Sequence, residues 1–207
     1  MAGAFAGFPH EAIDFFKGLE ANNKKEWFQA RKDVYERVCR EPMKDLMAEL
    51  EPHLGRSKIS RINRDIRFSS DRSPYKTHIS AGVGRYYIAL SSAGLFVGTG
   101  MYKLDSPTLE RFRSAIDNDA SGRKLHTLVA SLRRKGYRVD THESVASAPR
   151  GYSVDHPRIE LLRMKDVFAG KTMPPGPWLS SRKAFDRIKR VMIDIKPFSD
   201  WLERHVG

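Results

Sequence analysis

The sequence has a single cysteine, Cys39, among its 207 residues. One thiol cannot form an intrachain disulfide, and it excludes iron–sulfur clusters and multi-thiolate metal sites. No run of about 18 apolar residues occurs, and no basic start precedes an apolar stretch at the N-terminal end. We therefore expect a soluble, cytoplasmic protein without a membrane partner.

The chain has fewer acidic than basic residues. It contains 25 Asp and Glu and 37 Lys and Arg, so the formal net charge is +12. This excess favours anionic partners. The hydrophobic content of 40% supplies enough material for a core, which excludes global disorder. The length predicts a single domain, residues 1–207. Within it, the Pro-rich residues 173–177 predict a hinge before a C-terminal helical segment at 179–205.

Signals for bound metals and nucleotide cofactors are missing. The seven histidines include no pair at metal-ligand spacing, so no metal site is predicted. Gly98 and Gly100 match neither a phosphate-binding loop nor a dinucleotide fingerprint. We accordingly expect no cofactor.

Helical periodicity dominates the first quarter of the chain. Apolar residues recur at helical steps over residues 9–20, where Pro9 suits the first turn. A second helix is predicted to hold Trp27 and Val38, with Asn23 as its N-cap. Pro42 is expected to kink this helix or to open another one.

From Lys58 the apolar period changes to two, which predicts an extended segment through Ile62 and Phe68. Residues 77–101 then predict an antiparallel meander with tight turns. Helices are expected from Ser106, as an N-cap, and again up to a stop at Gly136. Residues 137–140 fit a short strand, and residues 159–169 fit a helix or a strand equally well. The predicted fold class is α+β, with N-terminal helices, a central antiparallel meander sheet and C-terminal helices.

The densest motif covers residues 61–76 and reads R-x-x-R-D-x-R-F-S-x-D-x-x-P-Y-K. Together with the early Asn22–Asn23 pair and the later Asp155-His156-Pro157 run, it resembles the signature of a domain family of unknown function found in bacteria and fungi. The resemblance extends from Phe8 to about Phe168. It implies an α+β single-domain protein, and it supplies no activity, cofactor or catalytic residue.

Four basic side chains in this motif are candidate ligands for an anion: Arg61, Arg64, Arg67 and Lys76. The planar guanidinium fork matches carboxylates and phosphates, so a cluster left partly unpaired would bind them. In the alternative interpretation, Asp65 and Asp71 neutralise these cations in a structural ion-pair network.

The loop at residues 146–157 is the second candidate. Arg150 and Tyr152 are predicted to help to bind the ligand, and His156 could act as a general base. The weak catalytic candidates are thus Asp65, Asp71, His78 and His156. The alternative is ordinary loop structure. If this loop folded over the arginine-rich segment, the combined set would form the best active site in the chain.

Two further basic stretches lie at residues 121–139 and 182–190. They could attract nucleic acid nonspecifically, but no nucleic-acid-binding motif accompanies them, and solvated helix surface is the favoured interpretation.

The leading function hypothesis is the binding of an anionic ligand, such as a phosphate, a nucleotide or a polyanion. The alternatives are an enzyme acting on a phosphorylated or carboxylated substrate in the same cleft, and a protein-interaction module without a small-molecule site. The sequence carries no signal for an oligomeric state.

Overall fold

The computed structural model describes residues 4–65 and 71–207. Its first helices are α1 (His10–Ala21), α2 (Lys25–Gln29), α3 (Lys32–Tyr35), the π-helical turn η1 (Glu36–Arg40) and α4 (Glu41–Leu54). The strands are β1 (Ser57–Ile59), β2 (His78–Val83), β3 (Tyr86–Ser91), β4 (Gly94–Met101), β5 (Arg138–Asp140) and β6 (Val167–Met173). The remaining helices are α5 (Ser106–Asp117), α6 (Asp119–Arg134), α7 (Ile159–Leu162) and α8 (Lys183–His205). None of the helices in the described ranges has the length and apolar character needed to cross a bilayer.

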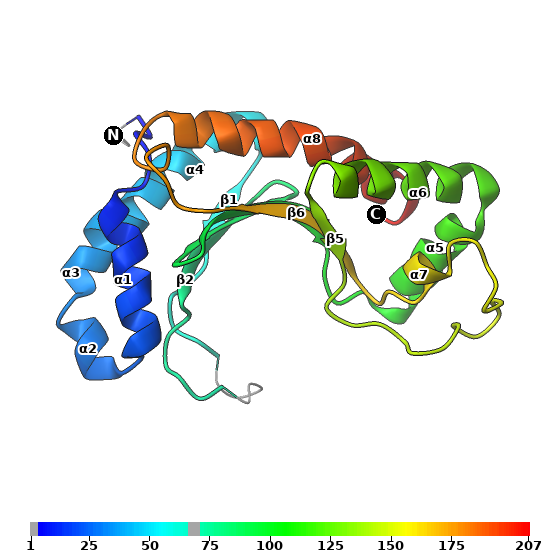
Figure 1. Cartoon of the computed structure of the whole chain (residues 1–207), viewed down its shortest axis with the longest axis horizontal. Helices are drawn as coiled ribbons and strands as arrows, with labels where there is room; N and C mark the ends of the chain where they lie inside the picture. Colours follow the sequence, from blue (N-terminus) through cyan, green and yellow to red (C-terminus); the bar gives the residue numbers. More distant parts are fainter. Residues whose placement is uncertain (1–3, 66–70) are drawn as a thin grey trace. The chain divides into compact units, whose positions relative to one another are not determined.

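The six strands form one sheet in the order β1-β2-β3-β4-β6-β5. Figure 1 labels β1, β2, β5 and β6 of this sheet. β1 pairs antiparallel with β2, and β2 with β3, in the register that joins His78 to Ser91 and Val83 to Tyr86. β5 and β6 are also antiparallel. The predicted α+β class and the meander over residues 77–101 are therefore confirmed.

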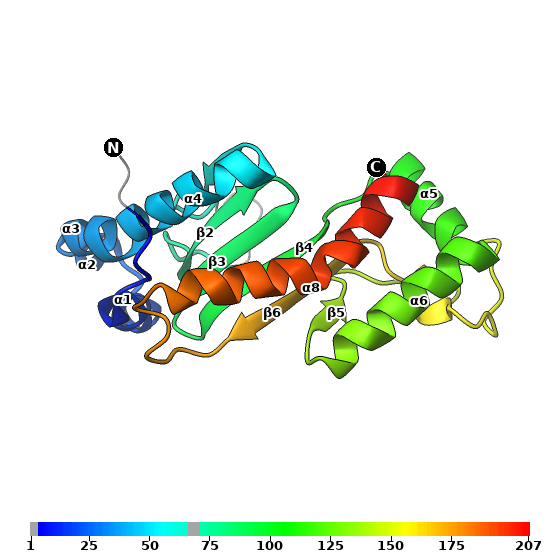
Figure 2. The same ribbon diagram turned by 90° about the horizontal axis from the view of Figure 1, so that it is seen from above.

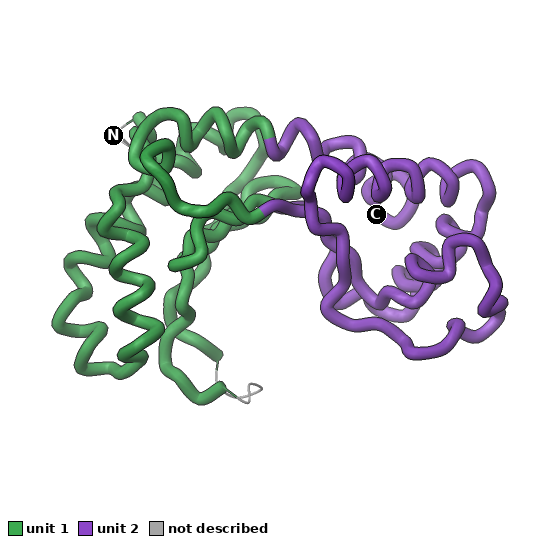
Figure 3. Tube along the Cα trace, in the orientation of Figure 1, with its two compact units in different colours: residues 1–97, 172–190 green, residues 98–171, 191–207 purple. Residues whose placement is uncertain are grey.

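The chain forms two compact units, coloured separately in Figure 3. Unit 1 comprises residues 1–97 and 172–190, and unit 2 comprises residues 98–171 and 191–207. The elements β4, β6 and α8 contribute residues to both units. β6 ends at Met173, where the predicted hinge begins, and the hinge and the single domain stay predictions.

The core of unit 1 follows from strand alternation. Ile79, Ala81, Ile88 and Leu90 are buried on one face of β2 and β3, which contact α4 and α1, and Figure 2 shows α4 beside β2. The opposite face of the same strands carries smaller or polar side chains, with His78 opposite Ser91. This alternation places the polar residues of the meander together on one side.

The N-terminal helices differ from the prediction at Asn23. Lys24, not Asn23, is the N-cap of α2, and no side chain caps that helix. The Asn23 amide instead binds the backbone of Tyr75. Pro42 lies in the first turn of α4, directly after the π-helical turn η1, so it opens a helix as predicted.

Residues 62–65, the described part of the extended segment predicted through residues 62–68, form a bridged segment and no regular strand. β1 ends at Ile59, and beyond it the structure has an isolated bridge between Asn63 and Tyr75. Phe68 lies outside the described residues. The period-two pattern here reflects a ribbon of two short segments, which the sequence could not distinguish from a strand.

In unit 2 the N-cap of α5 is Asp105, whose carboxylate accepts from Thr108 N–H at 2.9 Å; Ser106, the predicted cap, is the first helical residue. Gly136 ends α6 in the left-handed region, at φ 77°, as predicted. The ambiguous residues 159–169 contain both types of element: α7 first, and then the start of β6.

Candidate functional site

Two short segments of unit 1, residues 61–64 and 74–76, lie side by side and are called the ribbon below. Arg64 N–H donates to Pro74 O at 2.9 Å, and Lys76 N–H donates to Ile62 O at 2.8 Å. Asn63 and Tyr75 form the bridge between these bonds. Since neighbouring residues of an extended segment point to opposite sides, Arg64 and Lys76 share one face of the ribbon, and Asn63 and Tyr75 share the other.

The ribbon is fixed to the helices by Asn23 and Phe28. Asn23 Nδ2 donates to Tyr75 O at 2.9 Å, and Tyr75 N–H donates to Asn23 Oδ1 at 3.2 Å. The Tyr75 ring stacks on Phe28 with 4.1 Å between the ring centres. These contacts hold the ribbon in one position and so preorganise the charges that it carries.

Part of the positive charge on the ribbon is neutralised, as the network interpretation requires. Arg64 Nη1 lies 2.9 Å from Asp71 Oδ2, and Arg61 Nη2 lies 3.7 Å from Asp65 Oδ2 in an exposed pair. Asp71 also accepts from Ser73 N–H at 2.9 Å; hydrogen bonds to Ser73 lower the pKa of its carboxyl group, and Arg64 adds to this effect. Asp71 is thus held as an ion-pair partner rather than as a proton donor.

Lys76 is the exception. Within residues 4–65 and 71–207, no carboxylate lies within ion-pair distance of its ammonium group. Partial burial lowers the pKa of Lys76 below its ordinary value, and the positive charges of Arg61 and Arg64 lower it further. The ribbon therefore retains a positive charge that its own acids do not balance.

His78, the first residue of β2, extends this charged face. Burial lowers the pKa of its imidazole, and the charges of Lys76 and Arg64 lower it further. The ring is thus held in its neutral form at neutral pH, which is the form that a general base needs. The structure brings Arg64, Lys76 and His78 to this face, and it places Arg61 on the opposite one. The remaining predicted residue, Arg67, lies outside the described residues.

A cavity of about 370 Å³ lies on the opposite face of the ribbon. Its helical wall comes from α2, α3 and η1, and its other wall comes from the segment at residues 59–63 and Tyr75. Arg61 is the one predicted site residue among the described residues that line it. The helical wall was not predicted as part of a site, because the residues that form it read as an ordinary amphipathic helix.

Residues 149–158 belong to unit 2 and contain most of the loop that the sequence predicted at 146–157 as part of a site. His156 Nδ1 accepts from Arg158 N–H at 3.0 Å, and His156 Nε2 lies 3.2 Å from Asp117 Oδ1. Both ring nitrogens are therefore engaged within the protein. These contacts help to organise the loop, and the role of His156 as a general base stays a prediction.

Arg150 and Tyr152 also lie in this loop, which turns at Gly151 with φ 90°. Arg150 is exposed, and Tyr152 is partly buried near Asp117 and Arg113 of α5. Burial raises the pKa of Tyr152, and Asp117 raises it further. The residues that this loop contacts, such as Asp117 and Arg113, belong to unit 2.

Several cations of the two basic stretches are paired with acids. On and after α6, ion pairs join Arg123 to Asp119, Arg133 to Glu160, Lys135 to Asp194 and Arg138 to Asp140. In the second stretch, Arg182 pairs with Glu49, and Arg187 lies over the Trp178 ring. Several of these acids come from other elements, so a local charge count along the sequence could not reveal them.

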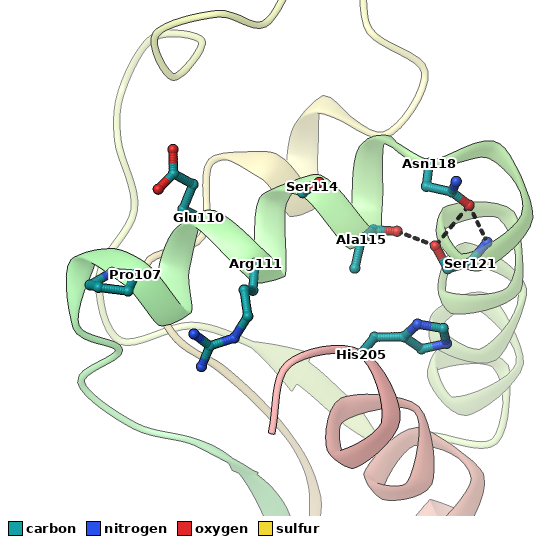
Figure 4. Close-up of a pocket in the computed structure, with 8 residues that line it drawn as sticks. All are labelled: Pro107, Glu110, Arg111, Ser114, Ala115, Asn118, Ser121 and His205. Atoms are coloured by element: carbon teal, nitrogen blue, oxygen red, sulfur yellow. Dashed lines mark hydrogen bonds between the residues drawn. The ribbon is translucent and has the colours of Figure 1, made fainter.

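A second depression of about 580 Å³ lies within unit 2, between α5, the start of α6 and the end of α8 (Figure 4). Its polar groups are mostly used by the protein. Arg111 donates to Val206 O and to Thr108, Ser121 donates to Ala115 O, and Asn118 caps α6. We regard it as a weaker candidate than the ribbon.

One titratable pair was not predicted at all. His142 Nδ1 lies 3.1 Å from Oδ1 of the buried Asp166, which also accepts from His142 N–H and Thr141 Oγ1. The two residues are 24 positions apart and share no motif, so the sequence offered no signal. All three contacts are made with the same oxygen of Asp166. They connect the loop after β5 to the residue that precedes β6.

Comparison with known proteins gives a family and no activity. No curated protein matches the chain. Among solved structures, a conserved hypothetical protein from Pyrococcus furiosus is similar at 13% sequence identity and a TM-score of 0.38, over 86% of this chain and 98% of that one. The model of a family described as "Conserved hypothetical protein (DUF2461)" matches residues 11–201. The chain therefore belongs to this conserved hypothetical family.

Proposed function

We propose that unit 1 binds an anionic ligand through the face of the ribbon that carries Arg64 and Lys76. The observation that carries this proposal is the uncompensated charge on Lys76: a partly buried ammonium group lies near two arginines, and no described carboxylate pairs with it. A phosphate or carboxylate group from a ligand would satisfy this charge, and guanidinium groups suit both.

The ribbon also holds Arg64 in a fixed position, as an anion-binding site requires. Arg64 is held by Asp71 and by a 3.4 Å hydrogen bond from Nη2 to Tyr75 O, so its direction is set before a ligand arrives. Asp71 consequently acts as a positioning group. The ion-pair network and the anion site are in this view two parts of one arrangement, with Lys76 as the part that is left for the ligand.

Titration calorimetry with pyrophosphate tests the proposal. We expect binding by the native chain and a loss of about tenfold or more in affinity for Lys76→Gln, since one charge-assisted hydrogen bond is removed. Lys58→Gln is the matched control, because Lys58 is an exposed lysine on neighbouring β1, and it should bind as the native chain does. Binding that is equal in both variants, or absent from the native chain, would refute the proposal.

A second candidate function is catalysis, and the position of His78 favours it. A neutral imidazole beside an anion site could remove a proton from a phosphorylated or carboxylated substrate. A panel of phosphatase, esterase and nuclease substrates tests this idea. Activity that is lost in His78→Gln but kept in Asp65→Asn supports it, and the absence of activity above the His78→Gln background rejects it.

A further inference from the structure

The cavity on the other face of the ribbon is a second place where unit 1 can hold a ligand. Its volume of about 370 Å³ lies near the small end of the usual range for ligand pockets, about 300 to 1,000 Å³. A single small metabolite fits this volume better than a dinucleotide or a peptide does.

The backbone that forms its wall is unusual. Glu36 and Arg40 line the cavity and are the first and last residues of the π-helical turn η1. Such turns are rare and occur often at functional sites, because the extra residue changes the direction of the side chains around it. The cavity and the irregular turn therefore coincide, and each is an independent sign of a binding site.

The charges of the cavity favour an anionic group. Its described lining contains three basic side chains, Lys32, Arg40 and Arg61, and one acid, Glu36. Glu36 pairs with Arg40 at 3.2 Å, whereas no described carboxylate forms an ion pair with Lys32. Lys32 can therefore bind a phosphate, and Arg61, whose exposed pair with Asp65 is long at 3.7 Å, can join it.

The uncharged residues of the lining favour a ligand whose uncharged part is flat and rich in hydrogen-bonding groups. Phe28, Tyr35 and Tyr75 form an aromatic wall, with 5.5 Å between the ring centres of Phe28 and Tyr35. The side-chain amides of Gln29 and Asn63 make no hydrogen bond to the described residues, so each keeps a donor and an acceptor for a ligand. A paired donor and acceptor of this kind suits the edge of a nucleobase.

From this combination we infer that the cavity between η1 and residues 59–63 is a binding site for a nucleoside monophosphate. Lys32 and Arg61 hold the phosphate, Gln29 and Asn63 bind the base edge, and the Glu36 carboxylate accepts from a ribose hydroxyl. The site is distinct from the face that carries Lys76 and does not depend on it.

Titration calorimetry of the full chain with AMP, GMP, CMP and UMP tests the inference, with inorganic phosphate and adenosine as partial ligands. We expect at least one mononucleotide to bind at least about tenfold more tightly than either partial ligand. Arg61→Gln and Asn63→Leu should each weaken that binding about tenfold, because both side chains are exposed and their loss leaves the fold intact. Lys25→Gln, an exposed lysine of α2 outside the cavity lining, should leave it unchanged.

The mononucleotide test of the cavity can fail independently of the pyrophosphate test of the Lys76 face. If no mononucleotide binds, or if Arg61→Gln and Asn63→Leu both bind as the native chain does, the cavity proposal is wrong whatever pyrophosphate does. Mononucleotide binding that is lost in Lys76→Gln and kept in Asn63→Leu would likewise overturn it and would assign the nucleotide to the Lys76 face.

Discussion

The ribbon of unit 1 and the loop at residues 149–158 of unit 2 have the same kinds of side chain, yet they use them differently. In the loop region, buried Arg158 donates to Ile116 O, Asp117 O and Asp119 Oδ1, and His156 uses both ring nitrogens. In the ribbon, Lys76 has no described ionic partner. The comparison shows that a charged cluster is a candidate binding site when one of its charges has no ionic partner within the described protein.

The largest effect should come from the loop region. Arg158→Met removes two hydrogen bonds to carbonyl oxygens at the end of α5 and one to Asp119 of α6, and it leaves the buried Ile116 O without this donor. We expect the free energy of unfolding to fall by about 3 kcal/mol. Chemical denaturation measures it, with Arg150→Met, an exposed arginine of the same loop, as the control that changes little. A loss below about 1 kcal/mol would show that Arg158 is not structural.

The second largest loss of stability is expected from Gly122→Ala, which disturbs the contact between Arg158 and the end of α5. A Cβ atom at Gly122 would lie 1.9 Å from Ile116 O and 2.7 Å from Arg158 Nε, so the end of α5 would have to move. We expect a loss of about 2 kcal/mol in the free energy of unfolding. In unit 1, Gly82→Ala meets its nearest neighbour at 3.9 Å and should change stability little. Equal effects at both positions would contradict this account.

The ribbon should respond in the opposite direction. Lys76→Met removes a partly buried charge that Arg61 and Arg64 repel, so we expect stability to rise by up to about 1 kcal/mol while pyrophosphate binding is lost. Thermal unfolding and calorimetry measure the two effects, and Lys58→Met should show neither. A destabilised Lys76→Met variant would place Lys76 among the structural residues, with Arg158.

The smallest effect is a pH dependence. The pKa of His78 is lower in the folded chain than its ordinary value of 6.5, so the unfolded chain takes up a proton first as pH falls. The free energy of unfolding should therefore decrease as pH falls from about 6.5, above the range where the lowered carboxyl pKa values act. Denaturation at pH 7 and pH 5 measures this, and His78→Gln should reduce the decrease. His205, whose pKa is also lowered, contributes to the remainder.

Sequence patterns predicted the regular elements well. Period-two alternation predicted β2 and β3, and helical periodicity predicted α1, α6 and α8, because burial of one face sets both patterns. At residues 62–65 the pattern could not show that the segment forms a short bridged ribbon and no regular strand, because both have the same alternation. The role of Asn23 was also missed, because its partner Tyr75 lies 52 residues away.

The candidate site could be predicted only in part, for a related reason. The motif identified Arg61, Arg64 and Lys76, but which of these cations is paired depends on the three-dimensional positions of Asp65 and Asp71. The cavity wall at η1 could not be predicted, since a π-helical turn leaves no clear sequence signal. The partners of the basic helix faces, such as Glu160 for Arg133, are equally distant in sequence.

The pKa of the Lys76 ammonium group, measured by NMR with and without pyrophosphate, tests the central claim most directly. We predict a value below the ordinary 10.5 in the free protein, because of burial and the two arginines, and a rise toward or above 10.5 when the anion is bound. A pKa that is the same with and without the anion, at concentrations that saturate binding, would contradict the assignment of Lys76 to the site.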